Sequence, residues 1–194
     1  MVKEANSDIK KFWDFLWNDE SIWGWLVSLA VIFIFIKFIF FPGLSAVLGT
    51  NLPLVVVESE SMSHQAFIFG EFEPWWNEHH QWYQERGITK QEARMWTLKS
   101  GLEKGDIAAV VGYRNSEPRI GDIIVFNAGQ IHPIIHRIIN IEERNGETYY
   151  STKGDGNSDQ ISLDRDIKRD QIIGRAILKL PKLGWIKLLV VQIF

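Results

Sequence analysis

The sequence predicts a mainly β protein: a small coiled β-sheet domain behind an N-terminal transmembrane helix, with a short aromatic-rich helical insert. Twenty consecutive, predominantly apolar residues, 22–41, carry a single charge, Lys37. A helix needs about that length to cross a bilayer core of roughly 30 Å. After Gly101 the chain changes to short β-branched runs separated by turn residues, a pattern typical of all-β domains.

Composition narrows the classes of protein further. The chain has 194 residues, enough for one domain and an appendage. Its formal net charge is only -3 and no basic stripe is present, so we expect no nucleic-acid partner. The absence of cysteine excludes disulfides, thiol catalysis and cysteine metal sites.

The N-terminal half of the chain carries the membrane signals. Residues 1–21 have apolar positions near helical spacing and are predicted to form a cytoplasmic amphipathic segment. Eight of the tryptophans form two clusters, for which we expect membrane boundaries rather than the alternative, core packing. These are Trp13, Trp17, Trp23 and Trp25, then Trp75, Trp76, Trp82 and Trp96.

Residues 22–41 form the predicted span, which we expect to end at Pro42-Gly43. A cleavable signal peptide is the alternative, but its apolar region is usually about 7–15 residues long. Lysines precede the span, whereas no Lys or Arg occurs between Lys37 and Arg86. The positive-inside rule therefore predicts a single-pass protein of the cell membrane, with a cytoplasmic N-terminus and everything after Pro42 outside.

A β-rich domain is predicted over residues 52–182. Its helical and aromatic insert covers 67–100, where Thr89 and Glu92 fit a capping box for a helix over 90–99. Residues 183–194 are apolar and too short to span a bilayer alone, so a core strand, a membrane-lying segment and the start of a second span all remain open. The predicted strands are 54–57, 107–111, 123–126, 134–141, 148–152 and 172–180.

Ser61 follows the first of these strands and is a candidate nucleophile, which needs a base to take its proton. His136 is flanked by four isoleucines on a rigid strand. Histidine in general suits proton transfer near neutrality, because a free imidazole has a pKa of roughly 6.5. A half-buried core histidine is the common alternative. Asp155 and Asp159, in a glycine-containing turn, could orient such a base, although turns of this kind are frequent without any catalytic role.

Metal and cofactor sites are not expected. His79 and His80 are adjacent, so regular structure would direct them to different sides, and no His-x-x-x-His or Glu-x-x-His spacing occurs. The Gly154-x-Gly156 pair lacks the third glycine and the helix of a phosphate-binding loop.

Four segments, in this order and behind an N-terminal anchor, resemble type I signal peptidases of the archaeal and endoplasmic-reticulum branch. The resemblance covers roughly residues 22–180. The segments are Ser59-Glu60-Ser61-Met62, Gly121-Asp122-Ile123-Ile124-Val125-Phe126, Pro133-Ile134-Ile135-His136-Arg137-Ile138 and Thr152-Lys153-Gly154-Asp155-Gly156-Asn157.

This resemblance implies a membrane-bound serine endopeptidase that removes signal peptides from exported preproteins. Ser61 would be the nucleophile, His136 the base, Asp159 the critical acidic residue and Asp155 a second one. Ser59 would help the Ser61 N–H form the oxyanion hole. His64, where many relatives have proline, is a rival base.

Substrate would bind as an added strand, and the substrate-binding residues are expected to be Val55, Val56, Val57 and Met62. Preprotein signal peptides, membrane lipid and the secretion translocon are the implied partners. The sequence leaves two alternatives to the peptidase. One is a catalytically silent membrane-anchored scaffold subunit, and the other is an esterase, which would need the absent Gly-x-Ser-x-Gly motif.

Overall fold

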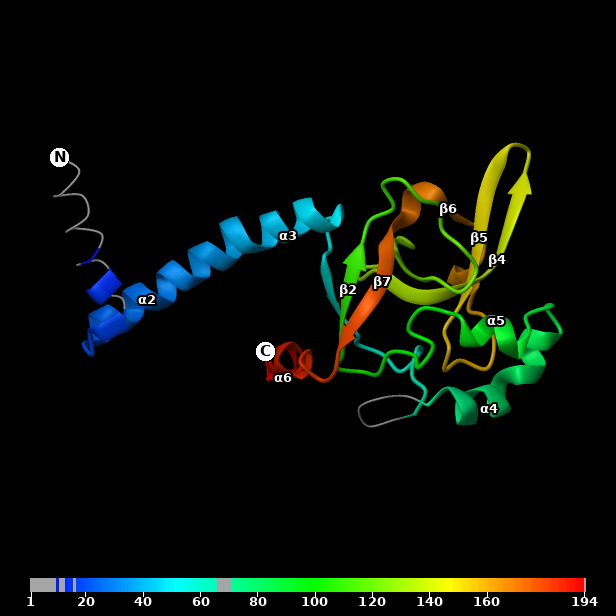
Figure 1. Cartoon of the computed structure of the whole chain (residues 1–194), viewed down its shortest axis with the longest axis horizontal. Coiled ribbons are helices and arrows are strands. Elements are labelled where there is room, and N and C mark those ends of the chain that lie inside the picture. The colour runs from blue at the N-terminus through cyan, green and yellow to red at the C-terminus, as the bar shows by residue number, and fades with distance from the viewer. Residues whose placement is uncertain (1–9, 11–12, 16, 66–70, 194) are drawn as a thin grey trace. The chain divides into compact units, whose positions relative to one another are not determined.

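The computed structural model describes residues 10, 13–15, 17–65 and 71–193 of the chain (Figure 1). It has two compact units, Met1–Val47 and Leu48–Phe194. The amphipathic segment predicted over 1–21 lies mostly outside the described residues.

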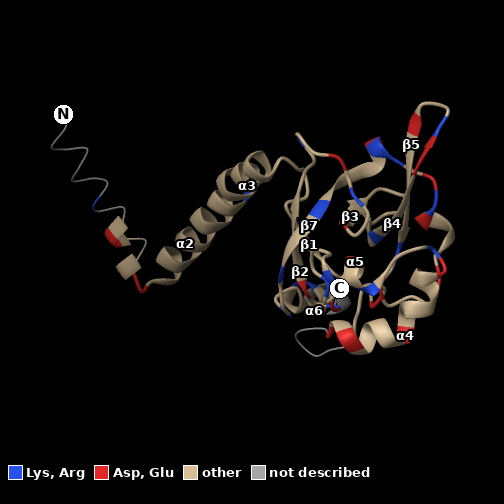
Figure 2. Cartoon of the chain, turned by 45° about the vertical axis from the view of Figure 1, so that its right-hand side comes forward, with Lys and Arg blue, Asp and Glu red and all other residues tan. Residues whose placement is uncertain are grey.

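The N-terminal unit is dominated by a long helix. It consists of α2 (Ile22–Phe35), a π-helical stretch η1 (Ile36–Phe40) and α3 (Phe41–Leu48). The Ser21 side chain caps its start by accepting a hydrogen bond from the Gly24 N–H at 3.0 Å. Within the described residues this is the one helix long and apolar enough to cross a membrane, and its ribbon in Figure 2 is almost entirely in the tan of uncharged residues.

The prediction that Pro42-Gly43 ends this helix was wrong, because α3 continues to Leu48. Proline lacks an N–H, and in a regular helix its ring collides with the carbonyl one turn earlier. Here the wider π turn of η1 comes directly before Phe41. A local π turn changes the hydrogen-bond pattern where the proline would otherwise clash, and the helix continues.

The second unit contains a curled antiparallel sheet of seven strands, which confirms the predicted mainly β fold. The strand order is β1-β2-β7-β3-β4-β5-β6. The strands are β1 (Leu54–Val56), β2 (Ile107–Val111), β3 (Ile123–Phe126), β4 (Ile134–Arg144), β5 (Glu147–Lys153), β6 (Ile167–Lys168) and β7 (Ile172–Leu180). β2, β3 and β7 have the predicted bounds, whereas the two-residue β6 was not predicted.

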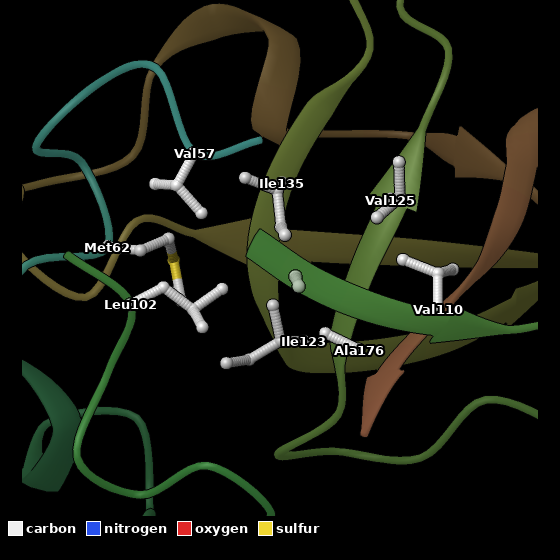
Figure 3. Packing of buried hydrophobic residues seen from close by; sticks show 9 residues of the cluster. Val57, Met62, Leu102, Val110, Ile123, Val125, Ile135 and Ala176 are labelled. Carbon is white, nitrogen blue, oxygen red and sulfur yellow. The ribbon is translucent and has the colours of Figure 1, made fainter. Parts of the chain in front are cut away.

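One core lies inside the curl of the sheet. Figure 3 shows Val57 and Met62 directed towards Leu102 and Ile135, with Val110 and Val125 of the sheet beside them. All of these side chains are buried. Val57 and Met62 lie on either side of Ser61 in the sequence and both belong to this core. The packing of the sheet therefore fixes the position of the segment that carries Ser61.

The aromatic insert, residues 71–97, contains two helices, α4 (Phe72–Gln84) and α5 (Lys90–Arg94). The predicted capping box is confirmed: the Thr89 side chain accepts from the Glu92 N–H, and the Glu92 carboxylate accepts from the Thr89 N–H. The helix ends five residues earlier than predicted, and Leu98 beyond it has a positive φ of 50°.

The second tryptophan cluster belongs to a core and not to a membrane boundary, so the prediction for it was wrong. Trp75 and Trp76 are each only 3% exposed. They pack with Tyr83 and neighbouring apolar side chains, and Trp82 and Trp96 lie partly buried against the same cluster. Burial of these large rings stabilises the insert on the sheet.

The chain ends in helix α6 (Trp185–Ile193), so the core-strand alternative for this segment was wrong. Its Lys187 is paired with Glu58 at 2.9 Å. Two short 3₁₀ turns, η2 (Ser162–Asp164) and η3 (Arg169–Gln171), flank β6.

Candidate active site

Ser61 lies in a tight turn after β1 that we call the serine loop, residues 58–64. The Ser63 N–H donates to the Glu60 carbonyl at 2.9 Å, closing the turn. The Leu102 N–H donates to the Met62 carbonyl, also at 2.9 Å. The Ser61 hydroxyl is 3.0 Å from the Ser59 hydroxyl. The closed turn and the buried Met62 therefore hold the partly exposed Ser61 in one place.

His136 is on β4, where it pairs in register with Ile124 of the central strand β3. Its side chain is 3% exposed, and its Nδ1 is 2.6 Å from Asp164 Oδ1. An ionised carboxylate only accepts hydrogen bonds, so the ring proton is on Nδ1. The Nε2 lone pair is then available to take a proton.

Asp164, which is not among the site residues predicted from the sequence, is held beside the His136 ring by further hydrogen bonds. It is fully buried on η2. Besides His136, its carboxylate accepts from the Thr152 hydroxyl at 2.6 Å and from the Ile161 N–H at 2.9 Å. Three hydrogen bonds compensate a buried carboxylate and fix its direction.

Ser61 and His136 line the same groove, which has a volume of about 740 Å³. Gly154 lies between them. A Cβ atom there would be 2.5 Å from the Ser61 carbonyl oxygen and 2.9 Å from His136 Nε2, so only glycine fits without a shift. The other lining residues are Leu52, Leu54, Val55, Val56, Glu58, Ser59, His132, Pro133, Ile134, Ile135, Asn157, Ile161 and Lys187.

Asp155 has a different partner from the one expected. Its carboxylate receives hydrogen bonds from Arg137 Nε at 2.8 Å and Arg137 Nη2 at 2.6 Å, and it lies 3.2 Å from His64 Nε2. Burial alone would raise the pKa of Asp155, but the Arg137 charge and the hydrogen bonds from Arg137 and His64 outweigh it and hold that pKa below its usual range. Asp155 thus forms a buried ion pair with Arg137. The carboxylate that contacts the His136 ring is that of Asp164.

Asp159 is also directed elsewhere. Its Oδ1 accepts from Trp82 Nε1 at 2.8 Å on the exposed side of the insert. Hydrogen bonds from the Gln160 N–H and the Trp82 indole lower the pKa of Asp159. The orienting role expected for Asp155 or Asp159 therefore has its geometric counterpart in Asp164.

The rival base, His64, is buried at 6% exposure on the far side of the serine loop. It contacts Asp155 through Nε2 and stacks on Trp75, with ring centroids 4.3 Å apart. Burial lowers the pKa of His64, against the opposing effect of Asp155. His64 lines a separate cavity with Trp75 rather than the groove of Ser61, so the geometry favours His136 as the base.

No protein-family model matches the chain. Curated relatives do: the "Signal peptidase complex catalytic subunit SEC11C" of Homo sapiens is 30% identical over 100 residues, 48% of this chain and 52% of the relative. The "Signal peptidase complex catalytic subunit sec11" of Dictyostelium discoideum is 43% identical over 75 residues, 35% and 42% of the two chains. The chain is a type I signal peptidase-like protein. It spans about half the length of the curated relatives it matches.

A third relative of this signal peptidase-like chain is the "Signal peptidase complex catalytic subunit SEC11" of Clavispora lusitaniae. It is 26% identical over 103 residues, 50% of this chain and 61% of the relative. All three relatives come from eukaryotes, and the archaeal side of the resemblance stays a prediction.

The expected substrate-binding residues of the signal peptidase-like chain separate into two groups. Val55 and Val56 line the groove. Val57 and Met62 are 1% and 0% exposed and belong to the core shown in Figure 3. A substrate could reach those two only by opening the core, so they support the serine loop from beneath and the expectation for them was wrong.

Within the described part of the chain, no group of three or more His, Asp or Glu side chains is arranged to hold a metal ion. The hydrogen-bonded groups around Ser61 and His136 can by themselves activate a hydroxyl and transfer its proton. Their arrangement supports nucleophilic chemistry of the serine type.

Proposed function

We propose that the chain is a membrane-anchored serine endopeptidase that removes signal peptides from exported preproteins, cutting after small residues. One observation carries this proposal: Ser61 and His136 line the same groove, and a buried carboxylate, Asp164, holds the His136 ring at Nδ1. The names of the curated relatives, catalytic subunits of signal peptidase complexes, support the same substrate class.

The proton path follows from this arrangement. The Ser61 hydroxyl attacks the scissile carbonyl while its proton moves to His136 Nε2. Asp164 stabilises the imidazolium that forms, through the 2.6 Å contact at Nδ1. The same proton then passes from Nε2 to the leaving amine, and water repeats the sequence to release the acyl group from Ser61.

The negative charge on the attacked carbonyl oxygen needs donors. The Ser61 N–H is one proposed donor and the Ser59 hydroxyl the other, because Ser59 lies within 3.0 Å of the attacking oxygen. Removing one donor of this kind typically costs about 10²–10³ in rate.

The groove can accept an extended peptide. β1 is at the edge of the sheet and pairs only with β2 among the described strands. On β4, residues Ile134 and Ile135 pair with β3, whereas the β5 pairing starts only at Arg137. Both groove walls therefore present backbone groups that can bind a substrate strand, with the apolar side chains of Val55 and Val56 beside it.

The anchor and its orientation complete the proposal. The apolar helix would span the cell membrane with the N-terminus in the cytoplasm and Ser61 outside, according to the lysine distribution. A short chain from Leu48 to Ser61 then tethers the nucleophile where signal peptides emerge. This tether raises the effective concentration of Ser61 at the cleavage site. Membrane lipid and the secretion translocon are the proposed partners.

A catalytically silent scaffold is the competing function. It gives no reason for a buried carboxylate with three hydrogen bonds behind a groove-lining histidine. We therefore favour the peptidase. The esterase alternative is also disfavoured, because the antiparallel sheet is not an α/β-hydrolase fold.

Cleavage of a preprotein by the full chain in detergent tests this function. We expect Ser61→Ala and His136→Ala each to lose at least about 10³-fold in rate, by analogy with catalytic triads, while circular dichroism shows both folded. His80→Ala, on the exposed face of α4, is the matched control and should cleave normally. Full activity in Ser61→Ala would contradict the proposal.

A further inference from the structure

One side chain of the aromatic insert touches both segments that carry the site. Trp75, on α4, donates from Nε1 to the Asp155 carbonyl at 2.8 Å. The same indole lies parallel to the His64 ring, with an interplanar angle of 4° and centroids 4.3 Å apart. Trp75 thus joins the serine loop to the turn at residues 154–157, which we call the glycine turn.

These two segments are in direct backbone contact. The Gly156 N–H donates to the Ser61 carbonyl at 2.8 Å. A Cβ atom at Gly156 would be 2.7 Å from the Glu60 carbonyl oxygen, which shows how closely the chains approach. Since Gly154 also lies against His136 Nε2, a displacement of the glycine turn changes the position of Ser61 relative to its base.

The insert that presents Trp75 is itself held at several points around the glycine turn. Trp82 donates to Asp159. The Lys153 ammonium lies 5.1 Å from the ring centroids of both Trp82 and Tyr83. The Arg137 guanidinium, which pairs with Asp155, lies 4.9 Å from the Trp96 ring centroid. Among the described residues, none that lines the groove comes from the insert.

We infer that Trp75 is a positioning residue that sets the geometry of Ser61 and His136 by bracing the serine loop against the glycine turn. This inference rests on the proposed peptidase function. It gives the insert a role in positioning the active site, in place of the membrane-boundary position expected for its tryptophans. A misplacement of about 1 Å in an active site can cost 10²-fold in rate.

A purely structural role for Trp75 is the alternative, and the chain provides a matched control for it. Trp76 is equally buried, at 3% exposure, and packs in the same cluster against Phe72 and Tyr83. The hydrogen bond to the glycine turn and the stack on His64 belong to Trp75 alone of the two. Trp75→Phe and Trp76→Phe remove the same atoms from one core, but only the first removes the hydrogen bond that joins the insert to the glycine turn.

The experiment compares kcat and KM of the full-length variants in detergent with a preprotein substrate, at a temperature where circular dichroism shows each folded. We expect Trp75→Phe to lower kcat at least about tenfold with KM within twofold of wild type, because the groove is untouched. Trp76→Phe should keep kcat within about twofold of wild type, even if its melting temperature falls by as much as that of Trp75→Phe. Equal kcat losses in both variants, or an unchanged kcat in Trp75→Phe, would overturn the inference.

If Trp75→Phe fails to fold, His64→Gln tests the brace from the other side, because glutamine can still donate to Asp155 but cannot stack on Trp75. A selective fall in kcat supports the inference and an unchanged kcat overturns it. Ser61→Ala is assayed in parallel. If Ser61→Ala retains full activity, the proposed function itself has failed, whereas an inactive Ser61→Ala with no difference between the two tryptophan variants rejects only the brace.

Discussion

His136 Nδ1 lies 2.6 Å from Asp164 Oδ1, and both side chains are buried. This contact fixes the tautomer of the imidazole and directs Nε2 towards the groove that Ser61 also lines. A serine and a histidine close in space are common in proteins. The buried carboxylate behind the histidine makes this pair a catalytic candidate.

Asp164→Asn should lower kcat by about 10²–10⁴, because an amide can hold the ring in the wrong tautomer while leaving the geometry intact. The assay is steady-state cleavage of a preprotein. Asp159→Asn is the matched control and should change kcat by less than about threefold, since its carboxylate meets an exposed indole. The opposite order of effects would show that Asp159 is the orienting acid.

Gly154→Ala should abolish most activity without removing any catalytic group. The added methyl would lie 2.5 Å from the Ser61 carbonyl oxygen and 2.9 Å from His136 Nε2, so one of the two must move. We expect kcat to fall at least about 10²-fold. Gly43→Ala, where a Cβ meets nothing within 4 Å, should cleave normally, and wild-type kcat in Gly154→Ala would contradict this packing.

Lys153 should make stability depend on pH in the alkaline range. Burial lowers its pKa from 10.5 to about 8, against the opposing charges of Asp155, Asp164 and Asp159. Between these two values the unfolded chain binds more protons than the folded one, so the free energy of unfolding rises with pH. Below pH 8 Lys153 is charged in both the folded and the unfolded chain, so the full cost of burying its charge lowers the free energy of unfolding.

The measurement compares denaturant unfolding of wild type and Lys153→Met from pH 7 to pH 10.5. The wild type should gain stability relative to the variant as pH rises above about 8. A difference that stays flat over this range would show that Lys153 keeps its ordinary pKa in the folded chain.

Ser59→Ala should reduce kcat by about 10²-fold, because its hydroxyl is a proposed donor to the oxyanion. The Ser59 and Ser61 hydroxyls are 3.0 Å apart. Ser59→Thr keeps the hydroxyl and should recover most of the activity. If the alanine and threonine variants are equally active, the Ser59 hydroxyl has no part in the reaction.

Much of the sheet could be predicted because most of its strands are β-branched runs bounded by turn residues, whereas the two-residue β6 is too short to show such a pattern. The Gly121-Asp122 turn, for example, leads directly into β3 at the predicted residue. The N-terminal helix was predicted to stop too early, since the π turn before Pro42 has no recognisable sequence signal. The membrane-boundary prediction for the second tryptophan cluster was wrong, because an indole ring suits a protein core as well as a membrane boundary.

The site could be predicted only in part. Ser61 and His136 stand out by their local sequence, as a turn serine after a buried run and a histidine among isoleucines. Asp164 has no such marker: it follows the glycine turn by several residues on a three-residue 3₁₀ turn. Only the tertiary fold brings it to His136, whereas Asp155 in the more conspicuous motif is used by Arg137.

Ser61 is the proposed nucleophile of a signal-peptide-cleaving enzyme. The most direct measurement is the mass of the products formed when a purified preprotein is incubated with the full chain or with Ser61→Ala. We expect one mature product, cut after a small residue, with wild type and none with the variant. The same product from Ser61→Ala, or no cleavage by wild type, would contradict it.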